Sequence, residues 1–213
     1  MTTIPKPYNT PVPMTRRLAH LVSWILSPLL IPSYATMAAL WLTPMAALSL
    51  RLRWQVTGSV WLITCVIPIL AILLMFSMKV ISDPALGNRR ERFIPYTLTS
   101  LCYIVATWYL WRIHAPEWMW MFMTAGAAAT ITSCLINRWW KISAHMAAMA
   151  GLTALILRMS LDHLASSALN PELTIAILLT GLLGTCRILL GCHTFWQVTA
   201  GAANGFLWVI LLT

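Results

Sequence analysis

Charged residues, and acidic ones above all, are scarce in this sequence. Of its 213 residues only 9% are charged and only five are acidic, whereas a soluble domain carries about 25% charged residues. This scarcity excludes an ordinary soluble globular protein. Apolar residues make up 60% of the chain and the mean hydropathy is +0.78. This composition predicts a membrane protein that crosses the bilayer several times.

Cysteine motifs and acidic clusters are missing as well. The five cysteines are an odd number and include no C-x-x-C motif, so we expect neither a disulfide framework nor a zinc site. The sequence holds no carboxylate cluster suited to Mg²⁺. We therefore expect no metal and no other cofactor.

A block of basic residues is also absent. The formal net charge is +9, but the lysines and arginines are scattered between apolar runs. We therefore expect no nucleic-acid partner. Charges placed in this way are typical of loops that orient helices or contact anionic membrane lipids.

Long polar connections are lacking, so we expect one integral membrane domain over residues 1–213. Seven apolar runs are long enough to cross about 30 Å of hydrocarbon as helices. They are Leu18–Thr43, Gln55–Met78, Ile94–Trp111, Trp118–Ile136, Ser143–Arg158, Leu173–Leu190 and Phe195–Leu212. The predicted fold is an all-α bundle of about seven transmembrane helices. Pro28, Pro32 and Pro68 fall within predicted spans, where kinks are tolerated.

Seven crossings place three unusual polar strings on one side of the membrane. We call the side that holds the N-terminus face A and the other side face B. Face A receives SDPALGNRRERFIP (Ser82–Pro95), RWWKISAH (Arg138–His145) and GTCRILLGCHTFWQVTAG (Gly184–Gly201). Ionisable residues beside membrane spans are functional candidates by default. Three such strings on one face therefore predict a common site.

Each string holds candidates for binding an anion. Arg89 and Arg92 share a face if a helix extends to them, and paired guanidiniums suit a phosphate. Ser143 is a candidate N-cap residue, and a helix N-terminus presents free N–H groups to an anion. Simpler interpretations stay open: a basic loop that sets topology, an interfacial His145, and an Arg187 that snorkels from a helix end.

The second and third strings together resemble the type 2 phosphatidic acid phosphatase (PAP2) superfamily. The third motif of that superfamily is S-R-x5-H-x3-D, and it is matched here by Cys186, Arg187, His193 and Gln197. The second motif is P-S-G-H, and residues 142–145 read Ile-Ser-Ala-His. Both the order of the motifs and the spacing within the third agree with the superfamily.

The first motif of the superfamily, K-x6-R-P, is matched loosely. NRRERFIP supplies arginines and Pro95, but no lysine stands seven positions before Arg89, Arg90 or Arg92. The resemblance covers mainly residues 79–205, and its strings are similar to a bacterial branch of small membrane proteins. It implies a PAP2-like helical core with two extra spans between the first and second motifs. It also implies location in the bacterial inner (cytoplasmic) membrane.

The resemblance implies a lipid phosphatase that works through a phosphohistidine and needs no metal. In this mechanism His193 attacks phosphorus, and His145 protonates the leaving group and then activates water. The residues expected to hold the phosphate oxygens are Arg89, Arg90, Arg92, Lys141, Ser143 and Arg187. Gln197 replaces the aspartate that orients the nucleophile. Its carbonyl can fix the imidazole tautomer but brings no charge.

Gln197 and the missing lysine leave alternatives open. The leading prediction is hydrolysis of phosphatidate, phosphatidylglycerophosphate or a polyprenyl (di)phosphate. A lipid phosphotransferase, and a binding or transport protein for lipid phosphates without catalysis, are the alternatives. An aspartate-rich lipid prenyltransferase is disfavoured, because the two aspartates, Asp83 and Asp162, are predicted on opposite faces.

The basic residues also predict which face is cytoplasmic. Ten lie on face A: Lys6, Arg16, Arg17, Lys79, Arg89, Arg90, Arg92, Arg138, Lys141 and Arg187. Four lie on face B: Arg51, Arg53, Arg112 and Arg158. Cytoplasmic loops carry the excess of Lys and Arg. We therefore expect the N-terminus and the candidate site on the cytoplasmic side.

Overall fold

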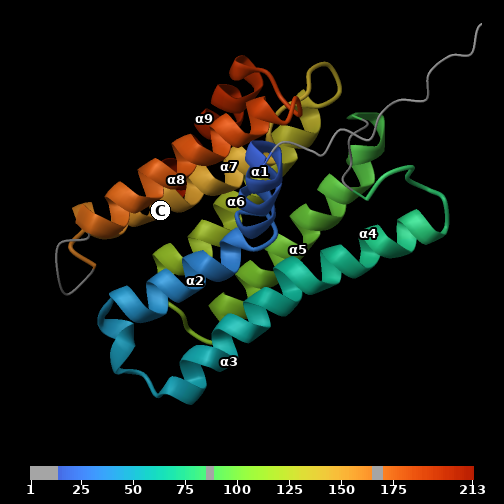
Figure 1. Ribbon diagram of the computed structural model, residues 1–213. Helices are drawn as coiled ribbons and strands as arrows, with labels where there is room; N and C mark the ends of the chain where they lie inside the picture. Colours follow the sequence, from blue (N-terminus) through green and yellow to red (C-terminus); the bar gives the residue numbers. More distant parts are fainter. Residues whose placement is uncertain (1–13, 85–88, 165–169) are drawn as a thin grey trace, which may run out of the picture.

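The computed structural model describes residues 14–84, 89–164 and 170–213, which form helices and no strand (Figure 1). The α-helices are α1 (Met14–Ile25), α2 (Ile31–Leu42), α3 (Leu50–Trp61), α4 (Ile67–Ser77), α5 (Phe93–Arg112), α6 (Glu117–Ile136), α7 (Ala144–Leu161), α8 (Asn170–Leu189) and α9 (Phe195–Leu212). Two short 3-10 helices, η1 (Pro44–Ala47) and η3 (Arg89–Arg92), precede α3 and α5. Lys6, counted above with face A, lies outside the described residues.

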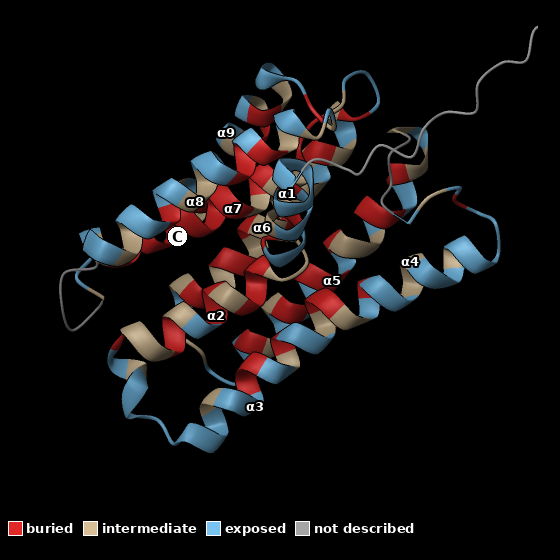
Figure 2. Ribbon diagram, viewed as in Figure 1, coloured by how far each residue is buried: buried red, intermediate tan, exposed pale blue. Residues whose placement is uncertain are grey.

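Six continuous helices in the described part are long and apolar enough to cross a membrane. Leu50–Ser77 counts as one of them, because the π-helical stretch η2 (Leu62–Val66) joins α3 to α4 without a break. These helices match the second to the seventh predicted runs. Many of their large apolar residues are exposed, and exposed residues lie on the outer side of the bundle (Figure 2). The all-helical prediction is confirmed, and the six helices are compatible with an integral membrane protein.

The prediction of one continuous span over Leu18–Thr43 is wrong. The run forms two helices of 12 residues each, α1 and α2, with Pro28 between them. Proline lacks the N–H that would continue a helix, and it disfavours the helical conformation of the residue before it. At 1.5 Å per residue each helix is about 18 Å long. Neither is long enough to cross about 30 Å of hydrocarbon alone.

Pro68, in contrast, lies in an unbroken helix. A proline ring clashes with the carbonyl four residues earlier, which belongs here to Thr64. Thr64 lies inside the π-helical stretch η2, directly before Pro68. A π turn widens the helix locally and is a common way to accommodate such a disturbance.

Helix α7 is the centre of the bundle. It packs against α8 and α9 and also contacts α2 and α6, and most of its length is buried (Figure 2). Glycines allow α9 to approach closely. A Cβ at Gly201 would collide with the carbonyl oxygen of Ser143, and one at Gly205 with the carbonyl oxygen of Ala147. The middle of α9 is thereby fixed against the start of α7.

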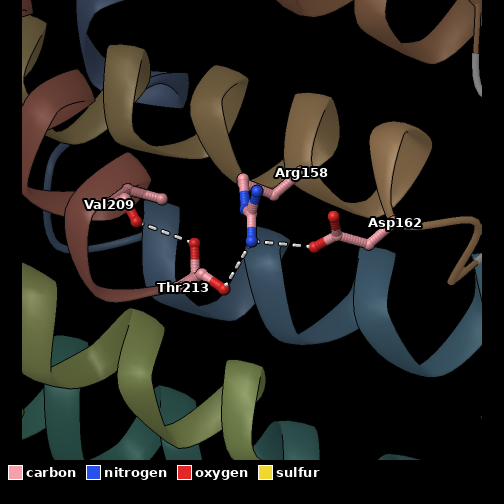
Figure 3. Close-up of polar contacts among 4 residues, drawn as sticks. All are labelled: Arg158, Asp162, Val209 and Thr213. Carbon is pink, nitrogen blue, oxygen red and sulfur yellow. Dashed lines mark hydrogen bonds and ion pairs between the residues drawn. The ribbon is translucent and has the colours of Figure 1, made fainter.

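The opposite ends of α7 and α9 meet in a polar contact (Figure 3). Nη2 of Arg158 donates to the backbone oxygen of Thr213 at 3.1 Å and pairs with the carboxylate of Asp162 at 3.0 Å. The hydroxyl of Thr213 donates to the carbonyl of Val209 at 2.7 Å. Because the two helices touch at both their starts and their ends, they run parallel.

Candidate functional site

A cavity of about 670 Å³ lies among α1, α5, α6, α7 and α9, beside the connections that precede α5, α7 and α9. Its size is typical of pockets for small molecules. All three polar strings contribute to its wall, which brings together segments that are far apart in the sequence. The predicted site residues that line the cavity are Arg92, Lys141, His145, Arg187 and His193.

The charged side chains of the wall favour an anion. Arg92, Lys141 and Arg187 bring three positive charges, and Asp83 brings one carboxylate to the same wall. Arg92 is buried, and Nε of Arg187 is buried without a hydrogen-bond partner. Buried cations attract a negatively charged group strongly, because the interior screens charge less than water does.

The turn that ends α8 holds Arg187 and His193 close together. Gly191 has a φ of +69°, in the left-handed region that favours glycine. The N–H of Cys192 donates to the carbonyl of Arg187 at 3.1 Å, and that of Gly191 to Ile188 at 2.8 Å. This is a Schellman motif. The N–H of His193 also donates to the Arg187 carbonyl, at 3.3 Å, so both side chains reach the same cavity.

The imidazole of His193 is oriented by Gln197. Oε1 of Gln197 accepts the backbone N–H of Thr194 at 3.2 Å, and it lies 3.2 Å from Nδ1 of His193. A backbone N–H can only donate, so the shared Gln197 atom is the carbonyl oxygen, and Nδ1 of His193 must carry the proton. Nε2 of His193 therefore holds the lone pair. The same glutamine completes the capping box that starts α9.

Burial and neighbouring cations keep His193 neutral. The side chain is only 6% exposed. Desolvation, followed by the charges of Arg92, Arg187 and Lys141, lowers the pKa of His193 to about 3. Because the ring loses its proton as the pH rises past that value, it is neutral at physiological pH. Burial, with Arg92 next in importance, also lowers the pKa of Lys141.

His145 faces the cavity from the first turn of α7. Its Nε2 lies 3.2 Å from the backbone oxygen of Ser23, in α1. A carbonyl only accepts, so Nε2 carries the proton and Nδ1 holds the lone pair. The two histidines of the site therefore have opposite tautomers: His193 offers Nε2 and His145 offers Nδ1.

Three predicted phosphate ligands do not line the cavity. Arg90 is exposed, and the backbone oxygen of Arg89 accepts a hydrogen bond from Nδ2 of Asn137 at 2.9 Å. Ser143 is completely buried, because its backbone lies against Gly201 of α9. Its N–H donates to the carbonyl of Gln197 at 3.3 Å. Arg89, Arg90 and Ser143 thus flank the site.

Several cavity residues were missed in the sequence. His20, Ser23 and Tyr96 line the cavity, and none of them was among the predicted site residues. Tyr96 lies one helical turn after Arg92, and this i, i+4 spacing was a usable signal. His20 and Ser23 line it because α1 is a short helix packed against α8, and no local pattern predicts that contact.

The cavity continues from its charged end into the apolar interior. Its deeper walls include Tyr103, Phe122, Ala125 and Val209. Arg92 and Tyr103 are separated by 11 positions along α5, which corresponds to about 17 Å at 1.5 Å per residue. The cavity thus joins a positively charged end to an apolar end.

Comparison of the chain with family models, with curated proteins and with solved structures found no match in any of the three.

Proposed function

We propose that this protein hydrolyses the phosphate or diphosphate group of a membrane lipid through a phosphohistidine on His193. The observation that carries the proposal is the state of His193: neutral, with Nδ1 bound to Gln197 and the lone pair on Nε2. A neutral imidazole is a competent nucleophile. The likeness of the third polar string to a PAP2 motif supports the same role.

The surroundings of His193 suit a lipid phosphate. Arg92, Lys141 and Arg187 line the same cavity and would bind the non-bridging oxygens by charge-assisted hydrogen bonds. The apolar depth of the cavity would accept part of the lipid tail. A soluble phosphate ester would leave that apolar volume unfilled.

In the first step, Nε2 of His193 attacks phosphorus and the bond from phosphorus to the leaving oxygen breaks. The leaving oxygen takes a proton from His145, whose protonated form is favoured by the bound phosphate charge. Because Nε2 of His145 is bound to Ser23, Nδ1 is the nitrogen that passes this proton. The three cations stabilise the negative charge that develops on the phosphoryl oxygens.

In the second step, a water oxygen attacks phosphorus and the P–N bond to His193 breaks. The water proton moves to Nδ1 of His145, and the electron pair of the broken bond returns to Nε2 of His193. Inorganic phosphate leaves and both histidines are restored to their starting charge. Gln197 keeps the proton on Nδ1 of His193 throughout.

A second candidate, a lipid-phosphate binding or transport protein, is favoured by one observation. Gln197 is uncharged and its oxygen is shared between His193 and the N–H of Thr194. A phosphorylated imidazole is positively charged, and at this position Nδ1 of the ring meets the uncharged amide of Gln197 in place of a carboxylate. The cations of the cavity alone suffice to bind a lipid phosphate.

Phosphate release by the purified protein separates the two candidates. Phosphatidate, phosphatidylglycerophosphate and a polyprenyl diphosphate are supplied in mixed micelles, and released phosphate is measured. We expect release from at least one lipid, and a loss of at least about 100-fold in His193→Asn, because asparagine lacks the imidazole nitrogen that forms the covalent intermediate. His114→Asn is the matched control. It lies at the other end of α5 with a φ of 57°, which asparagine tolerates. Binding without release from any lipid would favour the second candidate.

We also propose that the cavity faces the cytoplasm, because ten of the 14 lysines and arginines fall on face A when α1 and α2 together make one crossing. The test replaces the native cysteines, places one at Thr10, and adds an impermeant maleimide to intact cells. We expect labelling only after lysis. Labelling of intact cells would place the N-terminus outside. Thr10 lies outside the described residues.

A further inference from the structure

The break between α1 and α2 leaves backbone carbonyls without their usual helical partners. In a continuous helix the N–H of Ser27 would donate to the carbonyl of Ser23. Instead it donates to Trp24 at 3.3 Å, which is the carbonyl that Pro28, lacking an N–H, cannot serve. The break therefore releases the Ser23 carbonyl from the helix.

Side chains from other segments donate hydrogen bonds to the released carbonyls. Nε2 of His145 lies 3.2 Å from the Ser23 oxygen, although the two residues are 122 positions apart. The hydroxyl of Tyr34 donates to the carbonyl of Ile25 at 3.0 Å. Polar backbone groups away from water need partners, so the bond to His145 is part of what makes the break stable.

We propose that the break at Pro28 is the positioning device for His145. The released Ser23 carbonyl accepts from Nε2, and this fixes both the plane of the ring and its tautomer. Only Nδ1 is then free to transfer protons at the phosphorus. Ser23 and Pro28 are positioning residues, because they act on the substrate through His145.

This inference rests on the proposed function, because the proton transfers of His145 that it explains belong to that reaction. A carbonyl behind an imidazole acts as the carboxylate or carbonyl does behind many catalytic histidines: it selects one tautomer and stabilises the charged ring. When Nδ1 accepts the water proton in the second step, the ring becomes an imidazolium with two N–H groups. The Ser23 oxygen then accepts from a charged donor, and such bonds are roughly twice as strong as neutral ones.

Pro28→Ala tests the device. The substitution gives residue 28 an N–H that can donate to the carbonyl of Trp24, as in a continuous helix. Ser27 is then free to donate to the carbonyl of Ser23, in competition with His145. Pro32→Ala is the matched control. Pro32 is buried in the first turn of α2, where a missing N–H is tolerated because that N–H has no helical partner.

The first measurement is the ¹⁵N spectrum of the histidine rings in micelles, with the His145 signal assigned by its loss in His145→Gln. We expect wild type and Pro32→Ala to show His145 as the Nε2–H tautomer, and Pro28→Ala to show a mixture. An Nδ1–H tautomer in wild type would overturn the inference, and this reading does not depend on Pro28→Ala folding. An unchanged spectrum in Pro28→Ala would overturn it as well.

The second measurement is the pH profile of phosphate release. In Pro28→Ala we expect kcat to fall at least tenfold, with KM within about twofold of wild type. We also expect the limb of the pH profile that reports the protonation of His145 to shift along the pH axis. Equal activity in wild type and Pro28→Ala would overturn the positioning role while leaving the phosphatase proposal intact. If wild type releases no phosphate but shows the Nε2–H tautomer, the phosphatase proposal fails and the positioning of His145 stands.

Discussion

Gln197→Glu is the substitution that most sharply tests the role of Gln197 behind His193. It replaces an amide with a carboxylate of almost the same shape. Thr194 with glutamate three positions later is still a capping box, so the start of α9 is expected to fold as before. The only intended change is a negative charge 3.2 Å from Nδ1 of the imidazole.

The magnitude follows from that distance. Two unit charges 3.2 Å apart attract by about 5 kcal/mol at an effective dielectric constant of about 20, and burial of the new carboxylate offsets part of this. Opposite charges this close shift a pKa by roughly 1–3 units. The pKa of His193, about 3 in wild type, is therefore expected to rise to roughly 4–6. The ring stays mostly neutral at pH 7.

The same charge stabilises the positive ring that forms when His193 bonds to phosphorus. A shift of 1–3 units is worth roughly 1.4–4 kcal/mol, which corresponds to a rate increase of about 10- to 1000-fold if the transition state feels the full charge. We expect rapid-quench measurements to show phosphoenzyme forming at least tenfold faster, and an NMR titration to show the raised pKa. The control is Gln55→Glu, the same change on an exposed residue of α3.

Two results would refute this reasoning. An unchanged His193 pKa in Gln197→Glu would mean that the two side chains are not in contact. A raised pKa with no faster phosphoenzyme formation would mean that His193 is not the group that attacks phosphorus.

Three further predictions follow from the cavity and the packing. Arg92→Gln should lower kcat/KM by about 10- to 100-fold through the loss of a charge-assisted bond of about 1.5–3 kcal/mol, while Arg89→Gln, one turn away and outside the cavity wall, should change it less than twofold. Gly205→Ala should lower the stability in detergent by about 1–3 kcal/mol or more through overpacking, whereas Gly181→Ala, which meets nothing within 4 Å, should not. His145→Ala should slow release of a lipid alcohol more than release of an activated aryl alcohol, which needs less protonation.

Each of these has a clear contrary outcome. Equal losses in the two arginine variants would indicate a general charge effect in place of a direct phosphate contact. Equal melting temperatures for the two glycine variants would contradict the close contact of α7 with α9. Equal losses on both substrates in His145→Ala would show that His145 binds or packs and transfers no proton.

Much of the bundle was predictable because its signal is local. Six of the seven apolar runs became helices long enough to span a membrane, and Phe195–Leu212 has the predicted bounds. The break in Leu18–Thr43 was not predicted, because hydropathy does not distinguish a kinked span from two short helices. Pro28 breaks its helix while Pro68 does not, and the difference lies in the surroundings. The carbonyl of Ser23, released by the break, is bound by His145 of α7, whereas Thr64, whose carbonyl faces Pro68, lies in a π-helical stretch that keeps the helix continuous.

The candidate site was predictable in part for the same reason. Counting crossings placed Arg92, Lys141 and His193 on one face, and all three line one cavity. Spacing within a motif could not tell Arg92 from Arg89, because which arginine turns inward depends on how the connection packs against α6. Ser143 is the N-cap residue of α7, as predicted, but its side chain makes no capping hydrogen bond, and the close approach of α9 at Gly201 buries it away from the cavity.

The most direct test of the central claim is a search for phosphate on His193. Purified protein is mixed with ³²P-labelled lipid phosphate, quenched in alkali within milliseconds, and digested for mass spectrometry. We predict an acid-labile, base-stable label on the peptide that contains His193, at up to one phosphate per chain, and none in His193→Asn. Lipid hydrolysis at full rate with no label on His193, or an equal label in His193→Asn, would contradict it.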